Sequence, residues 1–352
     1  MRIAQIAPLI ERVPPKKYGG TERVVYELTE GLVKKGHDVT LFASGDSLTS
    51  AKLAFVYPRS LREAKIPDLY GANVLSLLHF GTAYSRQDEF DIIHDHTGIL
   101  SLPTAQIAHT PVLLTNHGPF LPEIHTIYKS LRAPYITSIS RSQVKGLTEI
   151  NWIGTVYNGL SMEHYPFSET DDGYLLFVGR LSMEKGPHLA IQVARQLDLP
   201  LILAAKLESM DMPYFKQYIE PYLSDTVRWI GEVTEEERNT LMSKALCFIH
   251  AVTWEEPFGL TLIEAMACGC PVVAFKRGSI PEIVLHKKTG FVVSTLKEMI
   301  EAVLNIREIS RTACREHAIR NFSAERMVNN YERVYRRIIR LNRLTPKKTN
   351  IL

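Results

Sequence analysis

The sequence predicts an α/β protein in which two doubly wound, Rossmann-like domains face a cleft. Short apolar runs rich in β-branched residues alternate with segments of helical periodicity along the chain, as in parallel α/β folds. The pattern stops in a polar stretch with Pro and Gly at residues 156–173 and then begins again. A chain of 352 residues is about twice the common domain length, so two domains are expected.

The first domain is expected to cover residues 1–157. A helix over 21–35 has one apolar face and ends at Gly36, which can terminate a helix. The segments 46–90 and 119–134 show no pattern from which an element can be assigned. The strands predicted for this domain are 2–9, 38–43, 91–96, 112–116, 135–140 and 155–157.

The second domain is expected to cover residues 158–322, and the final segment, 323–352, is helical in pattern throughout. Helices are predicted at 187–196, 234–244, 260–268 and 296–307. The strands predicted for this domain are 174–179, 201–205, 228–230, 247–251, 271–274 and 290–293.

Composition and charge exclude several classes of protein. Apolar residues make up 45% of the chain, but no run reaches the ~18 apolar residues of a membrane span. The N-terminus enters a strand without a signal-peptide pattern, so a cytoplasmic location is expected. The four cysteines lie in apolar or helical stretches without metal-site spacing, and a net charge of +3 argues against nucleic-acid binding. The basic segment 333–348 indicates a solvated helix face, or weak attraction to anionic lipid.

The segment "EEPFGLTLIEAMACGCP" (255–271) carries the strongest chemical signal. A helix that begins at Gly259 or Leu260 would point its first amide groups, including that of Thr261, at a phosphate. Glu264, one turn into this helix, can accept both hydroxyls of a ribose, and Glu256 can reach the hydroxyls of a second ring. Phosphate, diol and sugar together indicate a nucleotide sugar. Alternatively, both glutamates only stabilise the helix dipole.

The motifs around this segment resemble those of one family. "KYGGTERVVYELTEGLVKKGHDVTLFA", "DIIHDHTG", "TNHG", "VYNGL", "LLFVGRLSMEKG" and "WIGEV" occur in the order found in retaining family-4 glycosyltransferases, whose Glu-x7-Glu motif Glu256 and Glu264 match. The opening is similar to the subgroup that contains UDP-glucose:tetrahydrobiopterin glucosyltransferase.

The resemblance implies a GT-B architecture and retaining transfer of a hexose, glucose in the first instance, from UDP to a hydroxyl of a small-molecule acceptor. The partners would be the nucleoside-diphosphate sugar and the acceptor, with no metal and no other cofactor. Residues 1–157 would form the acceptor side and residues 158–322 the nucleotide-sugar side. The helix in 323–352 would cross back to the first domain.

The resemblance also implies four catalytic residues. Arg180 and Lys185 would stabilise the charge that develops on the departing diphosphate, which favours the transition state over the ground state. His96 would bind a hydroxyl of the donor sugar, and Glu256 would position that sugar. On the alternative interpretation, the two cations only begin a helix at the surface and His96 is a structural histidine.

The donor and acceptor sites follow from the same resemblance. Gly19 and Gly20 follow the first strand without the Gly-x-Gly-x-x-Gly pattern of dinucleotide binding, and they could equally form a plain turn. A metal site built from His94, His96 and His117 is a further alternative. Implied acceptor-side residues are Tyr18, Asn116 and His117. Implied donor-binding residues are Gly19, Gly20, Gly231, Glu232, Val233, Phe258, Gly259, Leu260, Thr261 and Glu264.

Two competing functions remain open at the level of sequence. A nucleotide-sugar epimerase or a sugar phosphorylase can share this architecture, and either would be recognised by isomerised sugar or by a requirement for phosphate. A non-catalytic nucleotide-sugar-binding protein would bind the donor without turnover. The intact set of Glu256, Glu264, Arg180, Lys185 and His96 argues against a protein that only binds.

Overall fold

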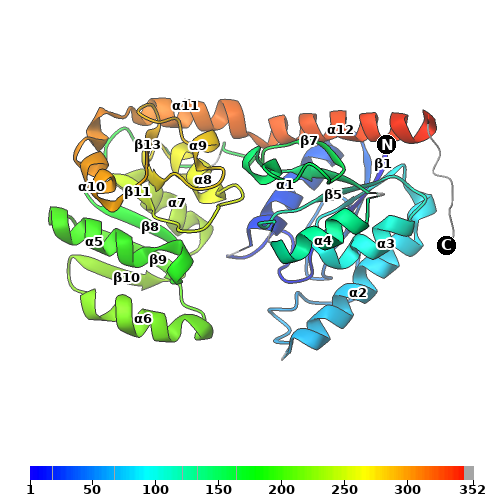
Figure 1. Cartoon of the computed structure of the whole chain (residues 1–352), viewed down its shortest axis with the longest axis horizontal. Helices are drawn as coiled ribbons and strands as arrows, with labels where there is room; N and C mark the ends of the chain where they lie inside the picture. Colours follow the sequence, from blue (N-terminus) through cyan, green and yellow to red (C-terminus); the bar gives the residue numbers. More distant parts are fainter. Residues whose placement is uncertain (18, 67, 121, 133, 164, 345–352) are drawn as a thin grey trace. The chain divides into compact units, whose positions relative to one another are not determined.

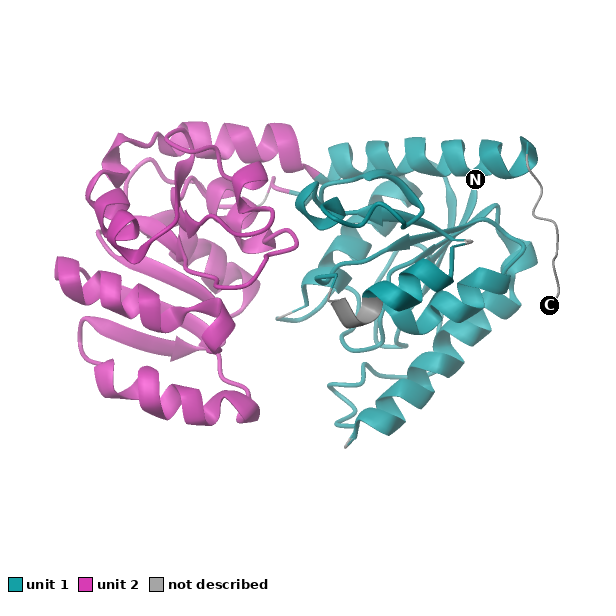
Figure 2. Cartoon of the chain, viewed as in Figure 1, with its two compact units in different colours: residues 1–161, 324–352 teal, residues 162–323 magenta. Residues whose placement is uncertain are grey.

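The computed structural model describes residues 1–17, 19–66, 68–120, 122–132, 134–163 and 165–344. It contains two parallel sheets, each covered by helices, which confirms the predicted α/β class with two Rossmann-like sheets (Figure 1). Two compact units account for the chain, and they are distinguished in Figure 2. Unit 1 combines Met1–Ser161 with the segment that begins at Ala324, and unit 2 is Met162–Ser323.

Unit 1 is built on a seven-stranded parallel sheet with the order β3-β2-β1-β4-β5-β6-β7. The chain adds β2 and β3 on one side of β1 and then moves to β4 on the other side. The strand order therefore reverses between β1 and β4, which is where open α/β sheets bind their ligands. The strands are β1 Arg2–Ile6, β2 Asp38–Phe42, β3 Lys52–Ala54, β4 Ile92–Asp95, β5 Val112–Thr115, β6 Tyr135–Ser138 and β7 Trp152–Thr155.

The long C-terminal helix α12 packs against α1 in unit 1. Its amide at Ala324 donates to the carbonyl of Leu160, and Tyr331 and Tyr335 on its inner face are fully buried. Burial of these large rings contributes to stability and fixes the helix on the unit. The α-helices of unit 1 are α1 Gly20–Lys34, α2 Leu69–Ser85, α3 Leu102–Ile107, α4 Pro122–Ser130 and α12 Ala324–Leu344.

The segments without a predicted element, 46–90 and 119–134, contain β3, α2 and α4. The helix α2, "LYGANVLSLLHFGTAYS", has no charged residue, so its sequence lacks the alternation of apolar and polar faces that identifies a helix. The last strand of the unit was predicted at 155–157, which is wrong, because it runs over Trp152–Thr155. Gly154 lies within this strand and weakens its signal.

Unit 2 contains a six-stranded parallel sheet with the order β10-β9-β8-β11-β12-β13. All six predicted strands are confirmed, and no strand end differs from the prediction by more than one residue. The strand order reverses between β8 and β11, at the centre of the sheet. The strands are β8 Leu175–Arg180, β9 Leu201–Lys206, β10 Val227–Gly231, β11 Cys247–His250, β12 Val272–Phe275 and β13 Gly290–Val293.

The helices of unit 2 begin and end where side chains or turns cap them. Thr234 and Glu237 form a capping box at the start of α7. The helix predicted over 296–307 is shorter, because α10 ends at Leu304 and a 3-10 turn follows. The α-helices are α5 Pro187–Leu197, α6 Met212–Tyr218, α7 Glu235–Lys244, α8 Leu260–Ala267, α9 Ile280–Ile283, α10 Leu296–Leu304 and α11 Arg311–Phe322. None of the helices in the described ranges is both long and apolar enough to span a bilayer.

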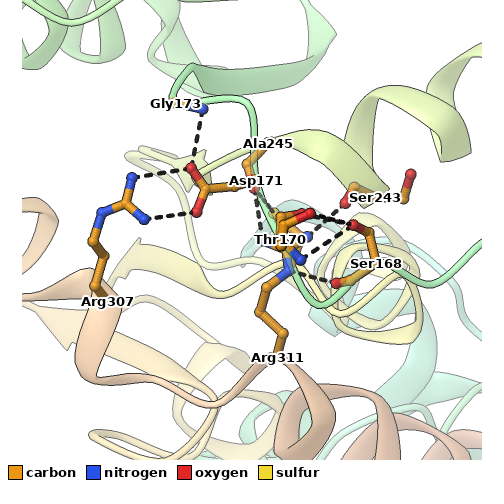
Figure 3. Close-up of polar contacts among 9 residues, drawn as sticks. Ser168, Thr170, Asp171, Gly173, Ser243, Ala245, Arg307 and Arg311 are labelled. Atoms are coloured by element: carbon orange, nitrogen blue, oxygen red, sulfur yellow. Dashed lines mark hydrogen bonds and ion pairs between the residues drawn. The ribbon is translucent and has the colours of Figure 1, made fainter.

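A buried arginine fixes the segment by which the chain enters unit 2 (Figure 3). The guanidinium of Arg311 donates to the carbonyls of Ser168, Ala245 and Ser243 at 2.7 to 2.8 Å. Arg307 forms an ion pair of 3.1 Å with Asp171 on the same segment. A buried guanidinium is costly without acceptors, and these three carbonyls satisfy it. Arg311 thereby joins α11 to the entry segment through Ser168 and to the end of α7 through Ser243 and Ala245.

Candidate active site

Polar side chains gather at the reversal point of unit 2, where β8 and β11 end side by side. Arg180 is the last residue of β8, and His250 is the last residue of β11. Beyond β8 the chain forms a short 3-10 turn, Met183–Lys185, and then begins α5. Beyond β11 it passes through a loop, 251–259, and then begins α8. The carboxyl ends of parallel strands share one edge, so both connections lie at the same crevice.

The two connections are tied together by their backbones. The amide of Thr253 donates to the carbonyl of Glu184 at 2.9 Å. Gly186 follows the 3-10 turn with φ +70°, and a Cβ atom there would lie 2.1 Å from the carbonyl oxygen of Ala251. A glycine is required both by this conformation and by the close approach of the two chains. The contact holds Lys185 beside the loop that follows β11.

Glu256 is the centre of the resulting charge cluster. Its Oε2 atom accepts hydrogen bonds from Lys185 Nζ at 3.0 Å and from Trp254 Nε1 at 3.1 Å. His250 Nε2 lies 3.7 Å from the same oxygen, and Lys185 Nζ is 4.7 Å from the centre of the Trp254 indole ring. Burial alone would raise the pKa of Glu256, but His250 and the charge of Lys185 outweigh it and hold that pKa at about 2. The carboxylate is therefore ionised at neutral pH.

Arg180 lies on the same connection as Lys185. Its guanidinium forms an ion pair of 2.5 Å with Glu184, the residue directly before Lys185, and its side chain is 30% exposed. Both predicted cations therefore belong to one charged cluster, each held by a carboxylate. A phosphate that enters the crevice would find two cations already oriented by neighbouring carboxylates.

The start of α8 adjoins Glu256. Gly259 precedes the helix with φ +84°, and no side chain caps this end. A Cβ atom at Gly259 would lie 3.5 Å from Cγ of Glu256 and 2.8 Å from Leu262 Cδ1. The first amides of a helix have no partner within the helix, and here they belong to the partly exposed Leu260 and Thr261. This end of α8 can therefore bind an anion beside Glu256.

Two of the predicted donor-binding residues are more enclosed than the motif suggests. Glu264 is only 2% exposed and forms an ion pair of 3.0 Å with Arg238 of α7. Phe258 is buried, and its ring packs edge-on against Phe322 with centroids 5.9 Å apart. The Phe258 side chain is therefore part of the core. The predicted base-binding residues at the end of β10, Gly231 to Val233, are partly exposed and share the edge of the sheet on which β8 ends.

The reversal point of unit 1 brings together His96, His117 and Asn116. Nδ1 of His96 lies 2.9 Å from Nε2 of His117, and Nε2 of His96 lies 2.9 Å from Oε1 of Gln5 in β1. Asn116 folds over its own turn by donating to the carbonyl of Gly118 at 3.0 Å. The amide of Gln143 donates to the same carbonyl at 2.8 Å and so supports the turn that carries His117.

His94 is a structural residue rather than a free ligand. Its Nδ1 lies 2.6 Å from the hydroxyl of Tyr335, and its Nε2 lies 2.7 Å from Oγ1 of Thr115. Both ring nitrogens are thus engaged, which argues against His94 as a metal ligand. Within the described ranges, three or more His, Cys, Asp or Glu side chains nowhere come together in a way that could hold a metal ion.

The glycines that follow β1 stand at the start of α1. Gly19 precedes the helix, and its carbonyl accepts from the amide of Arg23 at 3.1 Å. A Cβ atom at Gly19 would lie 2.6 Å from Cβ of Pro15, so the loop folds tightly over this end. Gly20 is exposed as the first residue of the helix. Tyr18, predicted on the acceptor side, lies outside the described residues.

Several residues of both sites were not predicted. In unit 2 these are His250, Trp254 and Arg238, and in unit 1 they are Gln5, Gln143 and Tyr335. His250 ends β11 directly before the loop that holds Trp254 and Glu256, so both residues could have been found by listing the polar neighbours of Glu256 in the sequence. No local pattern indicates Arg238, Gln143 or Tyr335, because these residues are distant in sequence from the site residues that they contact.

The buried histidines predict a loss of stability in acid. Burial lowers the pKa of His79 and of His117 to about 4 and brings those of His94 and His96 well below the usual value. The unfolded chain, with histidine pKa values of about 6.5, binds more protons between pH 6.5 and 4, so stability falls as pH falls. Each histidine contributes about 1.4 kcal/mol per pH unit well below pH 6.5.

Urea unfolding of the full chain at pH 7.5, 6.5 and 5.5 measures this effect. Glu22 acts in the opposite direction, because burial raises its pKa to about 7, and it offsets part of the effect of the histidines. The variant His79→Gln removes one of the four histidines and should reduce the total loss of stability between pH 7.5 and 5.5 by about 1.4 kcal/mol. A free energy of unfolding that stays constant from pH 7.5 to 5.5 would show that these histidines are protonated in the folded protein.

The fold and the site of unit 2 define a class of protein. A doubly wound sheet whose reversal point carries two cations, an ionised carboxylate and an open helix start is typical of a domain that binds a nucleotide through its phosphates.

The comparisons with known proteins agree with this class. Residues 18–150 match the family described as Glycosyltransferase Family 4, and residues 165–321 match the family described as Glycosyl transferases group 1. The chain belongs to the family-4 glycosyltransferases of GT-B fold.

Individual relatives are distant but cover the chain. It is 23% identical to N-acetyl-alpha-D-glucosaminyl L-malate synthase of Bacillus anthracis, over 92% of this chain and 95% of the relative. The solved structure of a sucrose-phosphate synthase from Thermosynechococcus elongatus superimposes with a TM-score of 0.80 at 18% identity, over 97% of this chain and all of that one. The solved structure of HepE of Anabaena in complex with UDP-glucose superimposes with a TM-score of 0.72 at 19% identity. The match covers 96% of this chain and 100% of that one. At these identities the structures show the fold alone.

Proposed function

We propose that the protein transfers a hexose, in the first instance glucose, from a UDP-sugar to a hydroxyl of a small-molecule acceptor, with retention of anomeric configuration. One observation carries this proposal. At the reversal point of unit 2, the ionised Glu256 holds Lys185 and adjoins Gly259 at the start of α8, and Arg180 is held by Glu184, the residue directly before Lys185. The relatives support it, since HepE is described in complex with UDP-glucose and the Bacillus anthracis relative is named for a small acceptor, malate.

The cluster suits a departing diphosphate. As the glycosidic bond breaks, negative charge grows on the phosphate oxygen, and cations oriented in advance stabilise that charge more than the ground state. Lys185 and Arg180 supply two charges and the start of α8 supplies amide donors. We propose that these groups take the part that a divalent cation plays in other transferases, so that the reaction proceeds without a metal.

Glu256 would bind the sugar rather than attack it. Its Oε2 already accepts from Lys185 and Trp254, which fixes the carboxylate as an acceptor for a sugar hydroxyl. The departing phosphate oxygen would take the proton of the acceptor hydroxyl on the same face of the sugar, which gives retention. Glu264 would contact the ribose, and Gly231, Glu232 and Val233 would meet the base. In unit 1, His117 and Asn116 would contact the donor sugar and the acceptor. His96, whose two ring nitrogens already meet His117 and Gln5, would act through His117.

Two assays on the full chain test this proposal. UDP-, GDP- and ADP-glucose are first compared by thermal shift, where a ligand at 100 times its Kd adds about 2.7 kcal/mol of stability. UDP-glucose is then incubated with an acceptor panel that includes tetrahydrobiopterin, with and without EDTA. We expect stabilisation by UDP-glucose, release of UDP only when acceptor is present, and an α-linked product by proton NMR that EDTA does not reduce.

The same assays distinguish the competing functions. Isomerised sugar from the donor alone would indicate an epimerase, and a requirement for phosphate would indicate a phosphorylase. Stabilisation by the donor without turnover on the whole panel would indicate a protein that only binds. A β-linked product would leave the glycosyltransferase activity in place and contradict retention.

A further inference from the structure

A buried chain of hydrogen bonds leads from the site of unit 1 to the C-terminal helix α12. His117 contacts His96 at 2.9 Å, and His96 contacts Oε1 of Gln5 at 2.9 Å. The amide nitrogen of Gln5 donates to the hydroxyl of Tyr335 at 2.9 Å, and this hydroxyl lies 2.6 Å from Nδ1 of His94. Five side chains are thus joined end to end, and Tyr335 is the one that α12 contributes.

The far end of this chain lies deeper in unit 1. Nε2 of His94 lies 2.7 Å from Oγ1 of Thr115, which is in turn 2.7 Å from Oγ1 of Thr137 and 3.2 Å from the hydroxyl of Tyr331. Gln5, His94 and Tyr335 are fully buried, and His96 is 3% exposed. Solvent therefore has little access to these groups, so each donor needs an acceptor within the chain of hydrogen bonds.

The orientation of the Gln5 amide sets the direction of every other bond. Its nitrogen faces Tyr335, so the hydroxyl of Tyr335 accepts there and donates its own hydrogen to Nδ1 of His94. Its oxygen faces His96, so Nε2 of His96 carries the hydrogen. Nδ1 of His96 then has a lone pair and accepts from Nε2 of His117. Reversal of the amide would exchange donor and acceptor at each of these positions.

These hydrogen-bond directions require neutral histidines, because a doubly protonated ring would have no acceptor nitrogen. Burial lowers the pKa values of His94 and His96 well below their usual range, and it lowers that of His117 to about 4 although the ring keeps some exposed surface. All three rings are neutral at pH 7. Each therefore has one protonated nitrogen, and the hydrogen bonds determine which one it is.

We infer that Gln5 and Tyr335 are positioning residues that fix the tautomers of His96 and His117, so that Nδ1 of His117 presents a hydrogen-bond acceptor to a substrate hydroxyl. The available nitrogen is consistent with this role, since no hydrogen bond to Nδ1 of His117 is found within the described part of the chain. Nδ1 of His117 would then bind a group that donates a hydrogen bond, such as a hydroxyl of the sugar or of the acceptor molecule. An ether or carbonyl oxygen beside this nitrogen would be disfavoured, because it has no hydrogen to donate. This inference rests on the proposed function for the identity of the substrate.

Nitrogen NMR of the full chain labelled with ¹⁵N-histidine tests the inference directly. At pH 7.5 and without substrate, we expect protonated Nε2 and unprotonated Nδ1 at both His96 and His117, with single-histidine variants used for assignment. A protonated Nδ1 at His117 would overturn the inference. Because this readout needs no turnover, it separates the two claims. Expected tautomers without glycosyl transfer would refute only the proposed function.

Two tyrosines of α12 provide a matched pair of variants. Tyr335→Phe removes the acceptor for Gln5, so the amide is no longer oriented and His117 should show both tautomers. We expect kcat/KM for UDP-glucose to fall about tenfold, the size of effect expected for one hydrogen bond. Tyr331→Phe removes an equally buried hydroxyl of the same helix that lies beyond Thr115, and it should change neither quantity. Identical spectra and kcat/KM in the two variants would refute the role of Tyr335.

Discussion

Replacement of Arg180 by alanine should lower kcat for glycosyl transfer by about 10²- to 10³-fold, and Lys185→Ala should have an effect of the same order. Both side chains are oriented by carboxylates at the reversal point of unit 2. On the proposed mechanism, loss of either would remove a positive charge from the departing diphosphate, whose negative charge is larger in the transition state than in the ground state. The effect should therefore appear in kcat, measured as UDP released at saturating donor and acceptor.

The control for these variants is a cation of the same unit outside the site. Lys297 is 87% exposed and forms only a 4.0 Å contact with Glu301, so Lys297→Ala should leave kcat unchanged. Lys185→Ala also removes a partner of the buried Glu256 and will cost stability, so its rates require a temperature at which the variant is folded. Turnover close to that of the unaltered protein in both Arg180→Ala and Lys185→Ala would refute the assignment of the site.

Gly186→Ala should destabilise the protein by about 3 kcal/mol or more. The backbone has φ +70°, which costs an alanine about 1 kcal/mol or slightly more, and the new methyl group would lie 2.1 Å from the carbonyl of Ala251. That clash involves backbone on both sides, so relief requires separation of the two connections that carry Lys185 and Glu256. Urea unfolding measures the loss, and kcat should fall along with it.

A second glycine isolates the effect of the close contact. Gly173 has φ +80°, but no atom lies within 4 Å of the position that its Cβ would take. Gly173→Ala therefore carries the conformational cost alone, about 1 kcal/mol. If the free energy of unfolding fell equally in the two alanine variants, the close approach of Gly186 to Ala251 would not contribute to the cost of the substitution.

Local patterns were sufficient for the core strands of each sheet, whereas the roles of the site residues were implied by the family resemblance. Short apolar strands and Gly-ended turns predicted all six strands of unit 2, since buried parallel strands are continuous runs of apolar residues. Lys185 and Glu256 are far apart in sequence, and their ion pair was not predicted, although strand ends of a parallel sheet meet at one edge. By contrast, α2 has no charged residues to reveal its periodicity and was missed.

Long-range pairs could not be predicted, because nothing in the local sequence marks them. Glu264 was expected to meet a ribose, and the sequence did not indicate that Arg238 of the neighbouring helix pairs with it. Gln5 and Tyr335 lie near opposite ends of the chain, and only the packing of α12 on unit 1 brings them into contact. The predicted roles of the site residues stay predictions until ligands are bound.

The proposed function depends most on where the diphosphate of the donor binds. A crystal structure of the full chain soaked with UDP measures this directly. We predict phosphate oxygens within hydrogen-bonding distance of Lys185 Nζ, of the Arg180 guanidinium and of the amides at the start of α8, with Gly259 closest to the phosphate. UDP bound elsewhere, or with its phosphates directed away from Lys185 and from α8, would contradict the account.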